Sequence, residues 1–311
     1  MNEKIKYILE KTEYIIPNLD IDGFFTAAIL KQVKNTIKTV GFSNSHDLVY
    51  FFEEMRGSFN KENTLYIDLY TKNCMCIDQH VISFDKNYNE SIKNKFNNLN
   101  PNVEFGRVGC VGEYYWKYPF SSAMWLIYCF NRIGINIDFD YNKIVFDDIT
   151  LAELFFHADS MLYNKIDKNH RYEKNILKWW DMLLEGNNNN NVTELHKIYM
   201  SLTDERIEYT HKKIGEFLQY NFRCKKNGGY SDIKNSLVKY SINEFINLIC
   251  NNMKVEPIII NFRDINLYEK KFNENKKVLI ETKQQFDDIV NKDNIFSFAF
   301  VFNNTLNYSY S

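Results

Sequence analysis

The most informative pattern in the chain is an apolar segment that acidic residues interrupt. An apolar run at residues 14–16 ends at Asp20, Asp22 and Gly23, and a second apolar run occupies residues 24–30. This order predicts a buried strand, a tight turn and a buried helix, which together begin a βαβ unit. Open α/β sheets bind ligands at the carboxyl ends of their strands, so the two aspartates are expected at such an edge.

Further strands and helices alternate over the following residues. Strands are predicted at residues 37–42, 64–70 and 74–81, and helices at residues 23–34 and from a turn at residues 44–47 to residue 55. This alternation favours a parallel, doubly wound sheet. Asp68 ends the third strand, and Asp78 and His80 end the fourth. We therefore expect these side chains at the same sheet edge as Asp20 and Asp22.

The second half of the chain is predicted to be helical first and mixed afterwards. Helices are expected at residues 121–133 and 151–162, and a polar helical stretch at residues 193–222 follows an Asn-rich loop at residues 187–191. Strands are expected at residues 237–240, 257–262 and 277–280, helices at residues 243–251 and 284–290, and a final hairpin turns at Asn303 and Asn304. The predicted fold class is α/β: a doubly wound parallel-sheet domain (1–185) is joined by a loop and helical connector (186–225) to a smaller mixed α/β domain (226–311).

Composition excludes several classes of partner. The chain has 311 residues, 45% hydrophobic content and a formal net charge of −2, so it can bury a substantial core but has no global attraction for nucleic acid or anionic membranes. It has no apolar window long enough to span a membrane, and residues 1–13 lack the apolar core of a signal peptide. Cys74 and Cys76 have no second cysteine pair to complete a zinc site and are expected in the core. A cytoplasmic protein is expected, and any nucleic-acid substrate is expected to be short. Assembly into a homo-oligomer is left open.

Candidate chemistry begins with the acidic residues. Two carboxylates as close as those of Asp20 and Asp22 repel each other unless a cation lies between them. Hard oxygen ligands suit Mg²⁺ or Mn²⁺, and the Thr26 hydroxyl can turn toward the same position. Asp-x-Asp-Gly also occurs in ordinary turns, and that alternative stays open. Asp159 lies among apolar residues and likewise needs a cation, an amide or an arginine as partner.

Four short motifs, taken in order, resemble those of the DHH phosphoesterase superfamily. They are Asp20-Ile21-Asp22-Gly23 with Thr26, Asp68 in YIDLY, Asp78-Gln79-His80 in CIDQHV, and Asp159 in LAELFFHADS. The resemblance covers about residues 14–165 and implies a two-domain hydrolase that holds one or two Mn²⁺ or Mg²⁺ ions. It implies these roles: metal ligands Asp20, Asp22, Asp68 and Asp159, catalytic residues Asp78 and His80, and substrate contacts Thr26 and His80. Water activated by the cations would attack phosphorus in line.

The chain departs from the family pattern in two places. Gln79 replaces the first histidine of the Asp-His-His motif and puts a weaker amide oxygen at a metal-ligand position. The glycine-rich GGGH-type loop of the family is missing, and Gly228-Gly229 does not match its spacing. Arg223, close to Lys225 and Lys226, is predicted to hold a substrate phosphate, with a solvated basic surface as the alternative.

Two functional hypotheses follow from these motifs. The favoured one is a metal-dependent phosphodiesterase or nuclease that acts on short oligonucleotides or nucleotide phosphoesters. The alternative is a catalytically degenerate relative that serves as a nucleotide-binding or protein-interaction module, and both Gln79 and the missing glycine-rich loop favour it.

Overall fold

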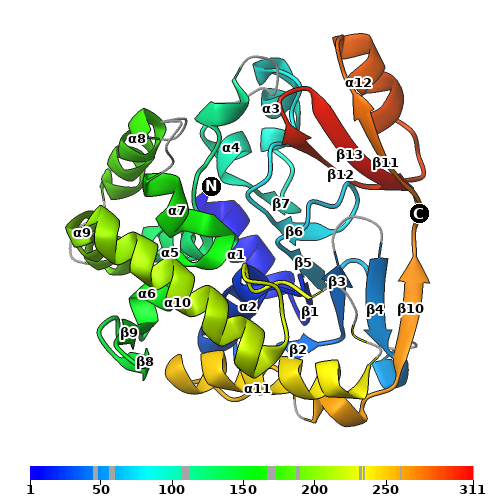
Figure 1. Cartoon of the computed structure of the whole chain (residues 1–311). Helices are drawn as coiled ribbons and strands as arrows, with labels where there is room; N and C mark the ends of the chain where they lie inside the picture. Colours follow the sequence, from blue (N-terminus) through cyan, green and yellow to red (C-terminus); the bar gives the residue numbers. More distant parts are fainter. Residues whose placement is uncertain are drawn as a thin grey trace. The chain divides into compact units, whose positions relative to one another are not determined.

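A five-stranded sheet in the order β2-β1-β5-β6-β7 contains most of the strands predicted in the first hundred residues and one, β7, that was not predicted (Figure 1). These strands are β1 (Tyr14–Pro17), β2 (Lys38–Thr39), β5 (Thr64–Ile67), β6 (Met75–Ile77) and β7 (Asn98–Leu99). Strands β1, β5, β6 and β7 pair in parallel. The predicted α/β class with a parallel sheet is therefore confirmed.

The computed structural model describes the chain except residues 45–47, 56–59, 107–112, 167–172, 187–189, 231–232, 234, 260 and 311. Two compact units are present, and both are discontinuous in sequence. The first contains residues 1–18, 39–118 and 266–311, and the second contains residues 19–38 and 119–265. This grouping differs from the sequence-based division at residues 185 and 226, because residues 226–265 belong to the second unit and residues 266–311 to the first.

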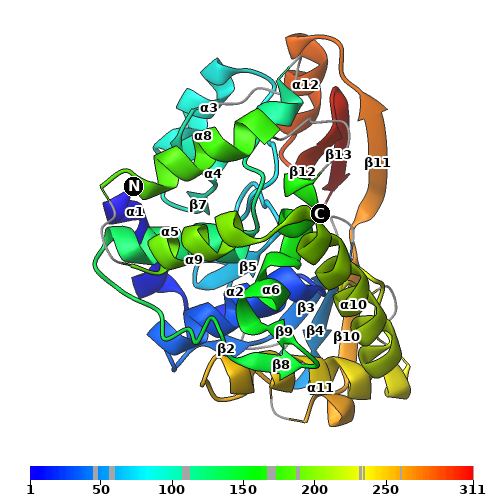
Figure 2. The ribbon, with the colours of Figure 1, turned by 60° about the vertical axis from the view of Figure 1, so that its left-hand side comes forward.

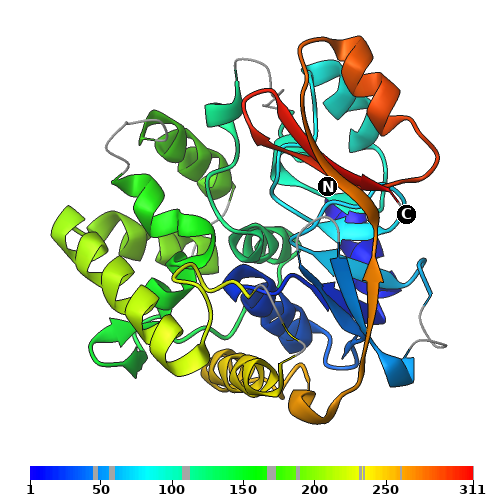
Figure 3. The ribbon, with the colours of Figure 1, turned by 45° about the vertical axis from the view of Figure 1, so that its right-hand side comes forward.

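The first unit also contains two antiparallel sheets. One has the order β10-β4-β3 and is built from β3 (Gly41–Asn44), β4 (Leu48–Phe52) and β10 (Leu267–Lys271). The other has the order β11-β13-β12 and is built from β11 (Asn273–Leu279), β12 (Ile295–Phe302) and β13 (Thr305–Tyr310), shown in orange and red in Figure 3. The turn between β12 and β13 has Asn304 at φ 65°, a left-handed conformation that asparagine tolerates, so the predicted hairpin is confirmed.

Four helices complete the first unit: α1 (Asn2–Lys11), α3 (Lys86–Lys93), α4 (Pro101–Glu104) and α12 (Lys283–Val290). Helix α12 begins with a capping box in which Thr282 and Gln285 bond each other's backbone amides. Helix α1 is tied to the unit by Lys4, which is 4% exposed. Its ammonium donates to Lys93 O at 2.8 Å and forms an ion pair with Glu104.

The second unit is mainly helical (Figure 2). Its helices are α2 (Ile21–Val33), α5 (Ser122–Arg132), α6 (Leu151–Phe156), α7 (Met161–Lys165), α8 (Glu173–Leu184), α9 (Asn191–Ser201), α10 (Asp204–Phe222) and α11 (Ser236–Asn252), with the hairpin β8 (Ile144–Phe146) and β9 (Ile149–Thr150). Helix α2 has no exposed polar face over residues 21–30. All ten of these residues are buried, as predicted for a helix inside a core.

The polar stretch at residues 193–222 is helical, as predicted, but it packs as part of the second unit. Arg206 of α10 donates through Nε to Glu153 at 2.5 Å and through Nη1 to Asp148 at 2.6 Å. Glu153 is 2% exposed, so this ion pair fixes α10 onto α6 from inside the unit. The buried side chains of α10 are mainly apolar, among them Ile207, Ile214 and Leu218, so the helix packs through an apolar face while its charged residues stay at least partly exposed.

Three predicted elements outside the acidic motifs are wrong. The helix expected to end at residue 55 is strand β4 followed by a 3₁₀ turn, Glu53–Met55; most of its predicted cap lies at residues 45–47, outside the described residues. The strand expected at residues 237–240 belongs to α11, which buries Ile242, Phe245, Ile246 and Ile249 at helical spacing. Among the described residues of 257–262 there is no strand, and Asn261 is left-handed with φ 54°.

The strand predicted at residues 37–42 is divided between two sheets. Lys38–Thr39 forms β2, and Gly41 begins β3. A Cβ at Gly41 would lie 2.2 Å from the backbone oxygen of Tyr50, so only glycine allows β3 to pair with β4 here. None of the described helices combines eighteen or more residues with the apolar content that a bilayer crossing requires.

Candidate metal centre

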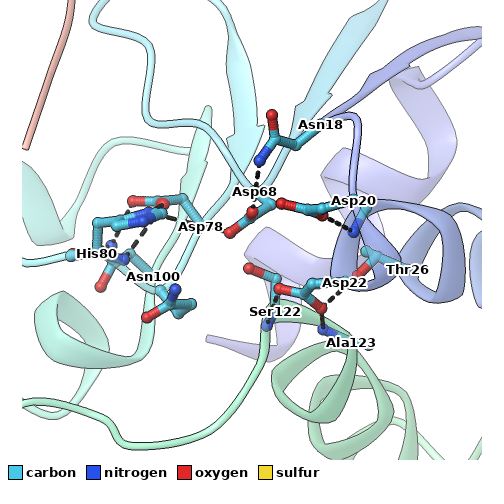
Figure 4. Close-up of polar contacts among 12 residues, drawn as sticks. Asn18, Asp20, Asp22, Thr26, Asp68, Asp78, His80, Asn100, Ser122 and Ala123 are labelled. Carbon is cyan, nitrogen blue, oxygen red and sulfur yellow. Dashed lines mark hydrogen bonds and ion pairs between the residues drawn. The ribbon is translucent and has the colours of Figure 1, made fainter. Parts of the chain in front are cut away.

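Three potential metal ligands of the first unit lie together at the ends of two neighbouring parallel strands. Asp68 follows β5, and Asp78 and His80 follow β6 (Figure 4). One ligand atom from each lies within 4.8 Å of those of the other two. Their alignment follows from the backbone, because Asp68 N donates to Ile77 O at 2.8 Å and so brings the two strand ends level. The structure thus brings these three residues together, and their roles stay predictions.

Asp78 fixes the orientation of His80. Its Oδ1 accepts from the His80 backbone amide at 3.2 Å and lies 2.5 Å from His80 Nδ1. Asp78 is fully buried, whereas the His80 side chain is 27% exposed. With the proton on Nδ1, facing the carboxylate, Nε2 carries the lone pair that can bind a metal or accept a proton.

Two asparagines that sequence reasoning missed support this turn. Asn100 Nδ2 donates to Asp78 Oδ2 at 2.9 Å and to His80 O at 2.8 Å. Asn102 Nδ2 donates to Gln79 O at 2.8 Å. Both asparagines are buried, and Asn100 also caps α4. The only signal in the sequence was Asn100 standing directly before Pro101, the pattern of a helix start.

Asp68 has an unusual backbone for a residue at the end of a strand. Its φ is 56°, in the left-handed region. Asn18, which follows β1, donates its Nδ2 to Asp68 Oδ2 at 3.0 Å. Asp68 is only 4% exposed, so the residue with this left-handed backbone also has a buried carboxylate. Such strain concentrates where geometry serves a ligand.

Asp22, in the second unit, is held by the start of α5. Its Oδ2 accepts from the Ser122 amide at 2.8 Å, and its Oδ1 accepts from the Ala123 amide at 2.9 Å (Figure 4). Thr26 Oγ1 donates to the same Oδ1 at 3.3 Å. Thr26 is fully buried, so its observed partner is Asp22, and its predicted contact with substrate stays a prediction.

The environment of Asp22 favours the protonated form of its carboxyl. Burial raises the pKa of this carboxyl above its ordinary value, while the Ala123 and Ser122 amides and a side-chain hydrogen bond with Asp159 pull it down without reversing the shift. A hydrogen bond between two carboxyl groups requires a shared proton. When the carboxyl groups of Asp22 and Asp159 are both ionised, a divalent cation can take the place of the shared proton.

Asp159 interrupts the helix predicted at residues 151–162. Helix α6 ends at Phe156, a 3₁₀ turn covers Ala158–Ser160, and α7 follows. Asp159 and Ser160 are both left-handed, with φ 47° and 58°. The prediction of one continuous helix is therefore wrong, and the break gives Asp159 a backbone like that of Asp68.

Asp20 is the N-cap residue of α2, so its carboxylate has a structural role in addition to its predicted role as a metal ligand. Its Oδ1 accepts from the Gly23 amide at 2.8 Å, the usual bond of an aspartate N-cap. Next to it runs the turn at Gly228 and Gly229, where a Cβ on Gly229 would lie 3.8 Å from Asp20 Cβ. The loop is joined to this point by the bond from Tyr230 N to Leu19 O at 2.9 Å. The two glycines, set aside on spacing grounds, therefore lie beside the first aspartate motif.

His157 secures the other side of this loop. Its Nε2 lies 2.7 Å from Lys226 O, a distance at which the ring nitrogen donates to the carbonyl. Burial lowers the pKa of His157 to about 4, so the ring is neutral at physiological pH. Arg223 ends α10 with φ 54° and is exposed, and its predicted contact with phosphate stays a prediction.

Replacing Gly228 with alanine is expected to destabilise the protein by about 2 kcal/mol, because φ is +83° and the new Cβ would lie 2.9 Å from Ile21 Cβ. Urea unfolding measures the change. Gly134→Ala is the control, since Gly134 has φ +82° with nothing within 4 Å of a Cβ. Equal losses in the two variants would show that Gly228 does not pack against α2.

The donor atoms of the cluster of Asp68, Asp78 and His80 suit a hard divalent cation. Carboxylate oxygens with one imidazole nitrogen are ligands that Mn²⁺ and Mg²⁺ accept, and there is no cysteine among them. Gln79, 5% exposed, lies between Asp78 and His80, and its role as a ligand stays a prediction. Comparison with protein-family models, with curated proteins and with solved structures finds no match to this chain.

Proposed function

We propose that the chain is a metal-dependent phosphoesterase that acts on short oligonucleotides or nucleotide phosphoesters, with Mn²⁺ or Mg²⁺ as cofactor. The observation that carries the proposal is the cluster of Asp68, Asp78 and His80 at adjacent ends of parallel strands. Ligands of α/β proteins bind at this edge of a sheet. The left-handed backbone of Asp68 supports a ligand role, because an ordinary strand end needs no such strain.

The residues of the cluster have distinct tasks. Asp68 offers a carboxylate whose position is set by Asn18, and Asp78 holds the His80 ring in one orientation. His80, the most exposed of the three, can hydrogen-bond to a substrate phosphate or transfer a proton through Nε2. A bound Mn²⁺ or Mg²⁺ supplies Lewis-acid activation of water and neutralises charge on the phosphoryl oxygens.

The family resemblance assigns further metal ligands to the second unit, namely Asp20, Asp22 and Asp159. The raised pKa of Asp22 supports this role, since its burial makes an uncompensated negative charge costly. The amides of Ser122 and Ala123 hold both of its oxygens, so the carboxylate is preorganised and needs little rearrangement on binding.

A substrate panel tests the proposal. The full chain is assayed with Mn²⁺, with Mg²⁺ and with EDTA on a short single-stranded RNA, a cyclic dinucleotide and a nucleoside monophosphate. Metal-dependent release of a phosphate-bearing product from at least one substrate is expected. The alternative, a degenerate binding module, is favoured by Gln79 at the histidine position. That alternative predicts metal-independent binding of these molecules without turnover.

Stabilisation by Mn²⁺ is expected to grow with pH. Because the folded pKa of Asp22 lies above 3.8, the metal-free native state keeps a proton that the unfolded chain has lost, and its stability falls as pH rises through that interval. Mn²⁺ replaces the proton, so the rise in Tm that it causes should be larger above the folded pKa of Asp22 than below it. Differential scanning fluorimetry measures this, and Asp22→Asn should weaken the pH dependence. A rise in Tm that is independent of pH in the parent protein would remove Asp22 from the ligand set.

A further inference from the structure

A small cavity lies within the first unit, and none of the residues of the metal cluster line it. Its volume is about 60 Å³, and nine described residues line it: Phe51, Lys61, Tyr66, Asn73, Cys74, Lys270, Phe272, Ile295 and Phe296. That volume is about twice the share of one liquid water molecule, which suits a single tetrahedral oxyanion. Asn73 and Cys74 precede β6, whereas the metal cluster follows the carboxyl ends of β5 and β6.

The charge of the cavity is entirely positive. Two of the nine lining residues are lysines and none is acidic. Within the described part of the chain, neither Lys61 nor Lys270 forms a salt bridge. Lys270 is held over the wall of the cavity, with its Nζ 5.0 Å from the centre of the Phe272 ring. Two exposed lysines in the lining of one hollow, with no acidic residue among the lining residues, provide an attractive potential for an anion.

Cys74 is a further lining residue of the cavity, and both lysines act on it electrostatically. Burial raises the pKa of its thiol, and the charges of Lys61 and Lys270 act in the opposite direction. Cys74 is 6% exposed, so the thiol is part of the floor rather than a reactive surface group. An anion in the cavity would therefore lie near both lysines.

Tyr66 adds a phenol to the lining of the cavity. The residue is 2% exposed, and its ring packs edge-on against Phe296, with ring centroids 5.7 Å apart. A phenol hydroxyl can donate a hydrogen bond to a bound oxyanion.

The aromatic walls make this a defined site rather than a basic surface. Phe272 and Phe296 stack with centroids 3.8 Å apart and planes inclined by 11°. Both are nearly buried, so they line the hollow and exclude water from one side of it.

We propose that this cavity is a binding site for a phosphate group, with Lys61, Lys270 and the Tyr66 hydroxyl as its donors and Asn73 at its rim. The phosphate belongs either to inorganic phosphate or to a nucleoside monophosphate, whose nucleoside would remain outside the cavity because of its size. The site does not depend on the proposed hydrolase activity and contains none of the residues of the metal cluster.

Isothermal titration calorimetry with inorganic phosphate and, separately, with AMP tests the proposal. The titrations use the full chain carrying Asp68→Asn, with EDTA present, so that a phosphate bound through cations at the metal cluster does not contribute. Lys61→Met and Lys270→Met are each expected to weaken binding roughly 10-fold, and Tyr66→Phe to weaken it roughly fivefold. Lys271→Met is the matched control, because Lys271 is the next residue of β10, is exposed and does not line the cavity.

The two titrations also identify the source of the phosphate. Tight binding of inorganic phosphate with no gain for AMP supports a site for the free anion, whereas tighter binding of AMP supports a nucleotide site. Absence of binding by both probes would overturn the proposal. An equal loss in Lys270→Met and Lys271→Met would also overturn it, since that result describes general attraction to positive charge.

Discussion

Replacing Asp68 with asparagine is expected to reduce metal-dependent hydrolysis of the best substrate by about 10²- to 10³-fold. Asparagine keeps the size of the side chain and tolerates the φ of 56° at this position, so the fold should persist. The loss therefore reports the carboxylate charge that meets the cation. Asp78→Asn should lose activity as well, because the carboxylate that orients His80 through Nδ1 becomes a neutral amide.

The measurement is kcat/KM with saturating Mn²⁺, accompanied by circular dichroism to verify folding. Asp293→Asn is the control, since Asp293 is an exposed residue of the same unit and undergoes the same change of charge. Activity of Asp68→Asn within twofold of the parent protein would show that hydrolysis, if present, uses another site.

The largest expected effect on stability comes from the ion pair between Lys4 and Glu104. Both side chains are only 5% exposed. Glu104→Gln leaves the Lys4 ammonium buried without a negative partner and is expected to lower the free energy of unfolding by about 3–5 kcal/mol. The Lys4 bond to Lys93 O at 2.8 Å does not compensate, because a carbonyl carries no net charge.

Guanidinium unfolding measures this effect, and two variants make it specific. The double variant Lys4→Met with Glu104→Leu removes both charges and should recover most of the loss. Glu90→Gln breaks an exposed pair with Lys93, 3.9 Å apart, and should cost less than about 1 kcal/mol. If Glu104→Gln is as stable as the parent protein, the pair is not buried in solution.

The sequence was sufficient to locate the acidic cluster of the first unit. Strand periodicity and the alternation with helices put Asp68 and Asp78 at corresponding ends of neighbouring strands, and β5 and β6 pair in parallel as this requires. Local rules of this kind succeed where a buried strand is short and uninterrupted. The start of α2 at the aspartate motif was predictable for the same reason.

Partners that are distant in the sequence could not be predicted in this way. The sequence predicts a helix where β4 lies, whereas β4 pairs with its neighbour β3 and with β10, which lies more than two hundred residues away with Leu267 opposite Phe52. The amides of Ser122 and Ala123 that hold Asp22 lie about a hundred residues from it. No periodicity signals such pairs, and the discontinuous division into two units is equally invisible to composition.

Anomalous scattering from crystals soaked in Mn²⁺ tests the central claim most directly. We predict a peak at bonding distance, about 2.0–2.3 Å, from carboxylate oxygens of Asp68 and Asp78 or from His80 Nε2, and its disappearance in Asp68→Asn. A Mn²⁺-soaked crystal with no peak at these three residues, or with a peak that persists unchanged in Asp68→Asn, would contradict the account.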